Sequence, residues 1–208
     1  MLLEFLISAF VTLVIVLDPI GLAPTFVAIT HGMPVAARRQ VAIRASLIAA
    51  GVLSGAALIG ANLLSAVGIS LPAFRIAGGL LLFSIASEMV FGLRIQRQAE
   101  TAEQAMEERV RNVAAFPLAI PLMAGPGAIT AMVLLSGRAT GHPDMLAGLI
   151  AAAVLDVALC LIVFLAASRI EKLLGITGNV VLSRLLGVLL AALAVQFVVD
   201  GVRAVLAG

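Results

Sequence analysis

The sequence PLMAGPG at residues 121–127 is related to DPIGLAPT at residues 18–25. This pair of stretches is the strongest indication of the fold. In each stretch two prolines stand five residues apart, and the second pair follows the first at an offset of 102 residues. A proline inside a helix removes a backbone donor and clashes with the preceding turn, while glycine lets the chain leave helical geometry. Both stretches therefore predict a local break in an otherwise apolar helix.

Matching blocks elsewhere in the chain indicate that its two halves are related. The sequence RIAG at residues 75–78 corresponds to RLLG at residues 184–187, at an offset of 109 residues. The sequence GLR at residues 92–94 corresponds to GVR at residues 201–203 at the same offset. The segments between the matching blocks therefore correspond as well.

The composition excludes a water-soluble domain. Of the 208 residues, 62% are hydrophobic and 12% are charged, and the mean hydropathy is +1.21. Soluble domains carry about 25% charged residues. The formal net charge of +2 is too small to indicate nucleic-acid binding. The single cysteine, Cys160, allows neither an intrachain disulfide nor a thiolate metal cluster. The sequence therefore indicates an integral membrane protein whose surroundings are the lipid bilayer.

Apolar segments long enough to cross a bilayer follow from the gaps between charges. No charged residue lies between Arg44 and Arg75 or between Arg111 and Arg138. Each of these gaps exceeds the roughly 20 residues that a helical span needs. We predict an all-α membrane protein of six transmembrane helices, of which the first and fourth are broken. The predicted spans are residues 3–30, 42–67, 74–92, 113–136, 145–168 and 181–203.

The related halves predict an inverted repeat. The first three-helix repeat covers residues 1–93, a charged cytoplasmic linker covers residues 94–112, and the second three-helix repeat covers residues 113–208. Three crossings are an odd number, so the second repeat must enter the membrane from the side opposite to the first. Inverted repeats with interrupted helices are typical of secondary transporters.

The distribution of basic residues predicts the orientation. Of the thirteen Lys and Arg residues, ten follow the first, third and fifth predicted helices. The opposite side has only Arg75, Arg138 and Arg203. Basic loops are retained in the cytoplasm. We therefore expect a cell inner (cytoplasmic) membrane protein with both termini outside the cytoplasm, either as a monomer or as a homo-oligomer.

The two breaks predict a central polar site. Unwound backbone N–H and C=O groups raise the free energy of the protein in hydrocarbon, unless they are buried in protein or face a wet cavity. Symmetry-related breaks near mid-depth should therefore face each other around such a cavity. The alternative is that the prolines only kink tightly packed helices. The candidate substrate-binding residues are Asp18, Pro19, Gly21, Pro24, Thr25, Pro121, Gly125, Pro126, Gly127 and Thr130.

Two acidic residues, Asp18 and Asp156, lie in the interior of predicted spans, where ionisable groups are rare without a partner or a role. Asp156 lies close to mid-depth, and it could exchange a proton during a transport cycle or form a hydrogen-bonded helix contact. Asp18 lies beside the first break, and it could bind a substrate ammonium group or a cation, or cap the following half-helix. Both are candidates for coupling to H⁺ or Na⁺.

Four further polar residues of the spans are candidates for lining the cavity or for joining neighbouring helices. Gln196 and Ser87 correspond at the 109-residue offset, and either could line the cavity or join neighbouring helices. Glu88 and Asp200 lie near helix ends, where Arg94 and Arg203 are expected to reach them as structural partners. No cluster of His, Cys and carboxylate residues indicates a metal site, and no catalytic triad or phosphate-binding loop indicates an enzyme. The sequence predicts no cofactor.

Four blocks carry a resemblance to a known family. They are DPIG at residues 18–21, RIAGGLLLF at 75–83, PLAIPLMAGPGAIT at 117–130, and residues 187–201. With these blocks the chain resembles, over nearly its whole length, the MarC family of bacterial and archaeal inner-membrane proteins. That family resembles the amino-acid exporter superfamily in its six-helix plan, and some members are described as small neutral amino acid transporters. Many members have Asn at the position of Asp18.

The sequence favours a secondary transporter or permease for a small polar solute. The resemblance alone implies small neutral amino acids as the substrate class. Half-helix N-termini after the breaks would face a carboxylate, and freed carbonyls with Asp18 would receive an ammonium group. The alternatives are a channel, and a structural or regulatory membrane protein that transports nothing.

Overall fold

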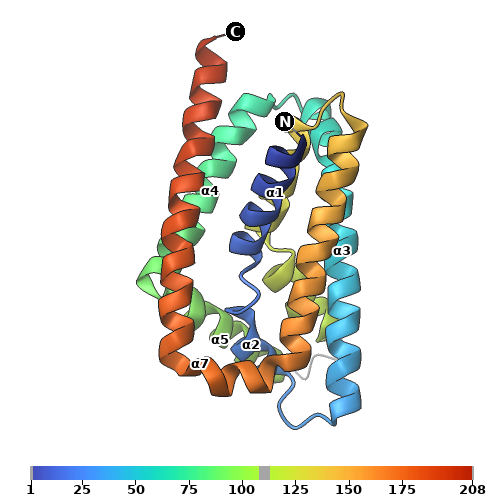
Figure 1. The fold of residues 1–208 in the computed structure, drawn as a ribbon, viewed down its shortest axis with the longest axis vertical. Coiled ribbons are helices and arrows are strands. Elements are labelled where there is room, and N and C mark those ends of the chain that lie inside the picture. Colours follow the sequence, from blue (N-terminus) through green and yellow to red (C-terminus); the bar gives the residue numbers. More distant parts are fainter. Residues whose placement is uncertain (1, 108–112, 208) are drawn as a thin grey trace.

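The helices account for nearly all of the chain. The computed structural model describes residues 2–107 and 113–207, and these residues contain helices and connections but no strand. Figure 1 shows an elongated bundle with both chain ends at the same end. In chain order the helices are α1 (Leu2–Leu17), α2 (Leu22–Ile29), α3 (Val35–Ala66), α4 (Leu71–Phe91), α5 (Leu93–Glu107), η1 (Ala114–Met123), α6 (Pro126–Arg138) and α7 (Pro143–Leu206).

Six membrane spans follow from these helices when each bent pair is one span. Four segments are long and apolar enough to span alone, namely α3, α4 and the Pro143–Ile170 and Thr177–Leu206 parts of α7. The pair α1 and α2 is bent by 46°, and the pair η1 and α6 is bent by 57°. The prediction of an all-α membrane protein with broken first and fourth helices is confirmed.

Helix α7 forms the last two spans without an intervening loop. It reverses direction around Gly175, whose φ of 59° and ψ of −177° lie outside the helical region. Glycine adopts such a positive φ at little cost because it has no Cβ. Figure 1 shows the chain descending, crossing the end of the bundle and rising again. The expected loop between residues 168 and 181 is therefore largely helical.

The arrangement is compatible with an inverted repeat. The connections at residues 67–70 and 139–142 lie at the same end as the chain ends, whereas α5 lies at the opposite end (Figure 1). With each bent pair taken as one span, this placement is what two halves of three spans in opposite senses would give. The repeat boundaries at residues 93 and 113 stay predictions, and residues 108–112 of the expected linker lie outside the described residues.

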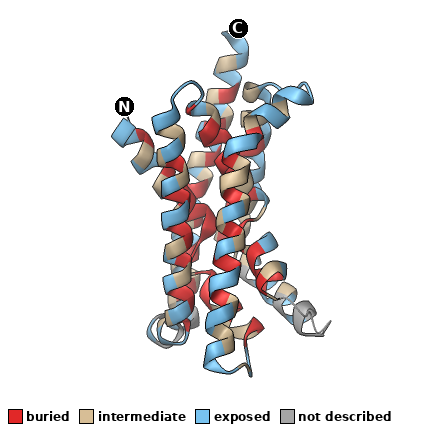
Figure 2. Cartoon of the chain, turned by 90° about the vertical axis from the view of Figure 1, so that its right-hand side faces the viewer, coloured by how far each residue is buried: buried red, intermediate tan, exposed pale blue. Residues whose placement is uncertain are grey.

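Small side chains form the inner face of α3. Ala42, Ala45, Ala49 and Leu53 recur at helical spacing, and each is fully buried. In lipid the hydrophobic effect does not drive helices together, so they associate largely by close packing. The alanine residues on this face allow the helix backbones to approach closely. On the outer face of the same helix, Leu47 is 69% exposed, as expected for a side chain that faces lipid. Figure 2 shows this division between buried inner and exposed outer faces along the bundle.

Candidate functional site

The first break is built around Asp18. This residue has a left-handed φ of 51°, and its carboxylate Oδ1 accepts a hydrogen bond from the Gly21 amide at 3.1 Å. A Cβ on Gly21 would overlap the carboxylate of Asp18, which is why glycine is needed there. Leu22 N donates to the carbonyl of Asp18 at 3.1 Å and starts α2. The Asp18 carboxylate therefore caps the turn that precedes α2, whereas α2 itself has Gly21 at its N-cap and no side-chain cap.

The second break joins η1 to α6. Within η1, Phe116 and Ile120 have extended φ and ψ, and each precedes a proline, which disfavours helical geometry in the preceding residue. Gly125 caps α6, and a Cβ there would collide with the carbonyl oxygen of Pro121. Pro126 occupies the first turn of α6, where its missing N–H costs nothing. At this break the surface that faces neighbouring groups is therefore formed by the main chain and not by side chains.

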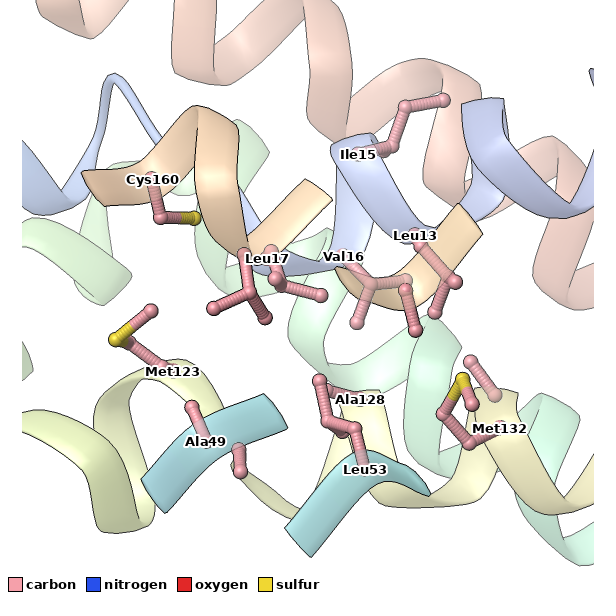
Figure 3. Close-up of a cluster of buried hydrophobic side chains, with 14 of the residues drawn as sticks. Leu13, Ile15, Val16, Leu17, Ala49, Leu53, Met123, Ala128, Met132 and Cys160 are labelled. Atoms are coloured by element: carbon pink, nitrogen blue, oxygen red, sulfur yellow. The ribbon is translucent and has the colours of Figure 1, made fainter. Parts of the chain in front are cut away.

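The two breaks lie in one buried cluster. Val16 and Leu17 end α1, while Met123 and Ala128 flank the second break, and all four are buried. Figure 3 shows these side chains together, with Cys160 of α7 beside Leu17. The structure therefore brings the two interrupted helices together at their interruptions.

Helix α5 closes the end of the bundle beside the breaks. In an unbroken helix the Val16 carbonyl would accept from the amide of residue 20, and here Arg94 Nη2 donates to it at 3.0 Å. Burial lowers the pKa of the Arg94 guanidinium, and the negative charges of Asp18 and Glu88 act in the opposite direction. Arg94 thus compensates both a carbonyl freed by the first break and the nearby carboxylate charge.

A second contact ties α5 to α2. The side chain of Gln98 is buried, with 6% of the residue exposed. The hydroxyl of Thr25 donates to Gln98 Oε1 at a long distance of 3.5 Å. The residue before Gln98, Arg97, forms an ion pair with Glu88 of α4 at 2.7 Å. The stretch expected as a solvated linker therefore contains a helix that contacts both α2 and α4.

A cavity of about 280 Å³ lies between α5 and the second break. Four of the predicted substrate-binding residues line it, namely Pro121, Gly125, Pro126 and Gly127. Its polar lining comes from α4 and α5, which supply Glu88, Arg94, Arg97, Gln98 and Thr101. The cavity is thus lined by unwound backbone together with one acidic and two basic side chains.

The predicted residues of the first half do not line this cavity. Asp18, Pro19, Gly21, Pro24 and Thr25 are absent from its described lining, and Thr25 reaches it only through Gln98. Thr130 is buried, and its methyl group lies 2.6 Å from the position that a Cβ on Gly78 would occupy. The two breaks are neighbours, but the cavity opens onto the second one.

Asp156 is fully buried in α7. Among the described residues neither of its carboxylate oxygens has a hydrogen-bond partner. Cys160, one turn further along α7, is close enough to both Asp156 and Asp18 to interact electrostatically with them. The structure therefore offers no partner for the hydrogen-bonded helix contact that was considered for Asp156.

The other polar residues have local partners. Ser87 is half-buried and donates to the Phe83 carbonyl on its own helix at 2.9 Å. Gln196 donates to Asp200 Oδ1 at 2.7 Å, one turn along α7. Glu88 forms its ion pair with Arg97, although Arg94 is also near enough to interact with it electrostatically. Asp200 pairs with Arg138 and not with the expected Arg203. Both pairs join neighbouring helices.

The fold and the breaks define a class of protein. It is an α-helical integral membrane protein of up to six spans, in which two spans are interrupted and meet at their interruptions. The chain belongs to the MarC family, because the model of the "MarC family integral membrane protein" matches residues 3–206.

Relatives described as UPF0056 membrane proteins extend this assignment. One from Methanocaldococcus jannaschii is 36% identical over 98% of both chains. The Escherichia coli K12 protein YhcE is 34% identical over 96% of this chain and 92% of its own. One from Archaeoglobus fulgidus is 35% identical over the same shares. No solved structure matches the chain.

Proposed function

We propose that the protein is a multi-pass inner-membrane secondary transporter or permease for a small polar solute. The observation that carries the proposal is the cavity of about 280 Å³ that reaches the unwound backbone of the second break. Irregular backbone at membrane depth is tolerated only where it is buried in protein or faces a wet cavity. No catalytic role is included in this proposal, and the family and the relatives are described only as membrane proteins.

Small neutral amino acids are the leading substrate class. Gly127 and Ala128 line the cavity in the first turn of α6. Helix N-termini favour negative charge because their amides lack intrahelical partners. A substrate carboxylate would bind there, and Glu88, which also lines the cavity, would receive an ammonium group in place of Arg97. This arrangement suits a zwitterion, and it leaves Asp18 as a cap close to Arg94 and not a direct ligand.

Asp156 supports coupling to protons. An uncompensated carboxylate inside a membrane span costs several kcal/mol, and none of the described residues pairs with Asp156. Carrying a proton is the simplest way for this side chain to stay buried in the conformation seen here. Release of that proton in another conformation would couple transport to a pH gradient.

The contacts of α5 favour a carrier over a channel. Arg94 and Gln98 bind α1 and α2 beside the cavity, and we infer that these contacts block the path from the cavity past α2. A channel needs a continuous open path, whereas a carrier alternates between closed ends. Opening would require Arg94 to leave the Val16 carbonyl, which it satisfies in this state.

Counterflow in proteoliposomes tests the proposal. Liposomes loaded with unlabelled glycine, alanine or serine are expected to accumulate the corresponding labelled amino acid transiently and saturably. A channel would equilibrate the label without overshoot. A protein that transports none of a broad solute panel would instead support a structural or regulatory role and overturn the proposal.

The orientation predicts which positions are open to a probe added from outside the cell. Thr140 lies in an exposed turn at the end that holds both termini, and Glu103 is exposed on α5 at the other end. In a Cys160→Ala background, a membrane-impermeant maleimide should label Thr140→Cys and spare Glu103→Cys. Labelling after cell lysis provides the control for reactivity. Labelling of Glu103→Cys alone in intact cells would reverse the proposed orientation.

A further inference from the structure

A second concave region lies on the outside of the bundle, away from the two breaks. It is a cavity of about 230 Å³ between α2, the start of α3 and the part of α7 that ends the fifth span. This volume equals that of roughly seven or eight water molecules in the liquid. Its lining combines apolar and basic side chains, which are Phe26, Val35, Arg38, Arg39, Phe164, Leu165 and Ser168.

The wall of this cavity is rigidly built. Phe26 and Phe164 are almost fully buried, and their rings stack with centroids 4.7 Å apart. The Arg38 guanidinium lies over the Phe26 ring at 5.9 Å from its centroid. Its Nη2 also donates to the Ser168 hydroxyl at 3.3 Å. Arg38 is therefore held at the cavity with part of its donor capacity still unused.

Among the described residues that line the cavity, the charged ones are both basic, namely Arg38 and Arg39. Helices α2 and α3 contain no acidic residue, whereas the first three turns of α3 carry Arg38, Arg39 and Arg44. Among the described residues no carboxylate pairs with Arg38 or Arg39. Arg39 also lines a neighbouring groove that includes Arg44, so the two hollows share one basic rim. An anion with two or more acceptor oxygens fits this rim, because guanidinium groups bind phosphate bidentately.

Apolar surface continues from the basic rim along the spans. Ile43 and Leu47 follow Arg39 at successive turns of α3, and they are 36% and 69% exposed. On the other side of the cavity, Leu165 and Ile162 are 54% and 62% exposed. The charged rim lies at the ends of two spans, where headgroups are found, and the apolar tracks run towards the hydrocarbon core. A free inorganic anion would contact only the basic rim, whereas a lipid would contact both the rim and the apolar tracks.

We propose that this cavity binds the headgroup of an anionic phospholipid at the end of the bundle that carries α5. The phosphodiester would lie on Arg39 and the free donors of Arg38, with acyl chains along Ile43 and Leu47. Basic pockets between transmembrane helices are known to hold such headgroups. The site is separate from the cavity at the second break, and its occupation does not depend on the proposed transport activity.

Native mass spectrometry of the purified full chain in detergent tests this proposal. Dioleoyl phosphatidylglycerol should bind about fivefold more tightly than dioleoyl phosphatidylcholine, and Arg39→Gln should remove most of this preference. Arg39 is exposed, so its replacement should leave the thermal unfolding temperature unchanged. Arg203→Gln, an exposed arginine at the opposite end, is the matched control and should retain the preference.

Two outcomes would overturn the lipid site. Equal loss of phosphatidylglycerol binding in Arg39→Gln and Arg203→Gln would show a general effect of charge. Displacement of the lipid by glycerol 3-phosphate or inorganic phosphate at equal concentration would show a site for a soluble anion, because neither competitor has acyl chains. Retention of the lipid against both competitors, with loss in Arg39→Gln alone, supports the proposal.

Discussion

Asp156→Asn is expected to abolish pH-driven accumulation of the transported solute while leaving solute exchange in place. Asparagine has nearly the same shape as aspartate and keeps its hydrogen-bonding capacity, but it cannot gain or lose a proton. Asp156 is fully buried with both carboxylate oxygens unpartnered among the described residues. Replacing a protonated carboxyl that has no partner among the described residues should not destabilise the fold.

The measurement compares uptake driven by a pH gradient with counterflow at equal pH in the same proteoliposomes. Asp144→Asn provides a matched control, since Asp144 is exposed in the first turn of the same helix. That variant should accumulate solute like the parent protein. Accumulation that survives in Asp156→Asn would assign Asp156 a structural role, whereas loss of counterflow as well would indicate damage to the solute path.

The second large effect is expected at Gly127, in the first turn of α6. A Cβ there would lie 2.5 Å from the Cδ1 of Ile85, which lines the cavity, and 3.5 Å from Leu82 and Val16. Ile85 would have to move, and the space it can enter is the cavity. Overpacking of this kind costs about 1–3 kcal/mol. If that cost falls on the transport step, Gly127→Ala should lower the rate by about five- to 150-fold, since about 1.4 kcal/mol changes a rate tenfold.

Gly148→Ala is a closely matched control for this variant. A Cβ on Gly148 would lie 2.5 Å from Leu6 Cδ2, so the steric demand is the same, and neither residue lines the cavity. Both variants should insert and reach similar membrane levels, and only Gly127→Ala should transport slowly. Equal rates for the two variants would mean that the second break is only a kink in a packed helix.

Much of the fold could be predicted because its signals are local. Pro19 and Pro24 in the first half, and Pro121 and Pro126 in the second, mark breaks that the structure places between α1 and α2 and between η1 and α6. Proline and glycine act on the backbone within one turn, so their effect does not depend on distant residues. The spans were predictable for a similar reason, since hydropathy is a property of each segment alone.

The side of the site formed by α5 could not be predicted. Arg94 and Gln98 belong to a polar stretch that reads as a solvated linker, and nothing near them in sequence indicates burial. Their partners, Val16 and Thr25, are 78 and 73 residues away along the chain. The Arg94 contact exists because the break leaves a carbonyl to be satisfied, so it follows from the tertiary arrangement of α1 and α5. The missing partner of Asp156 is likewise visible only once the neighbouring helices are packed.

The short turns at the end of the bundle that holds both termini have a practical consequence for structure determination. Residues 67–70 and 139–142 are the connections there, and the protein has a mass of only 21.3 kDa. Inside a detergent micelle such a particle has few features by which electron-microscope images can be aligned. The short turns offer an antibody fragment little surface to bind at that end, so α5 is the better epitope. A binder that recognises α5 in the position described here would favour the state in which Arg94 donates to the Val16 carbonyl.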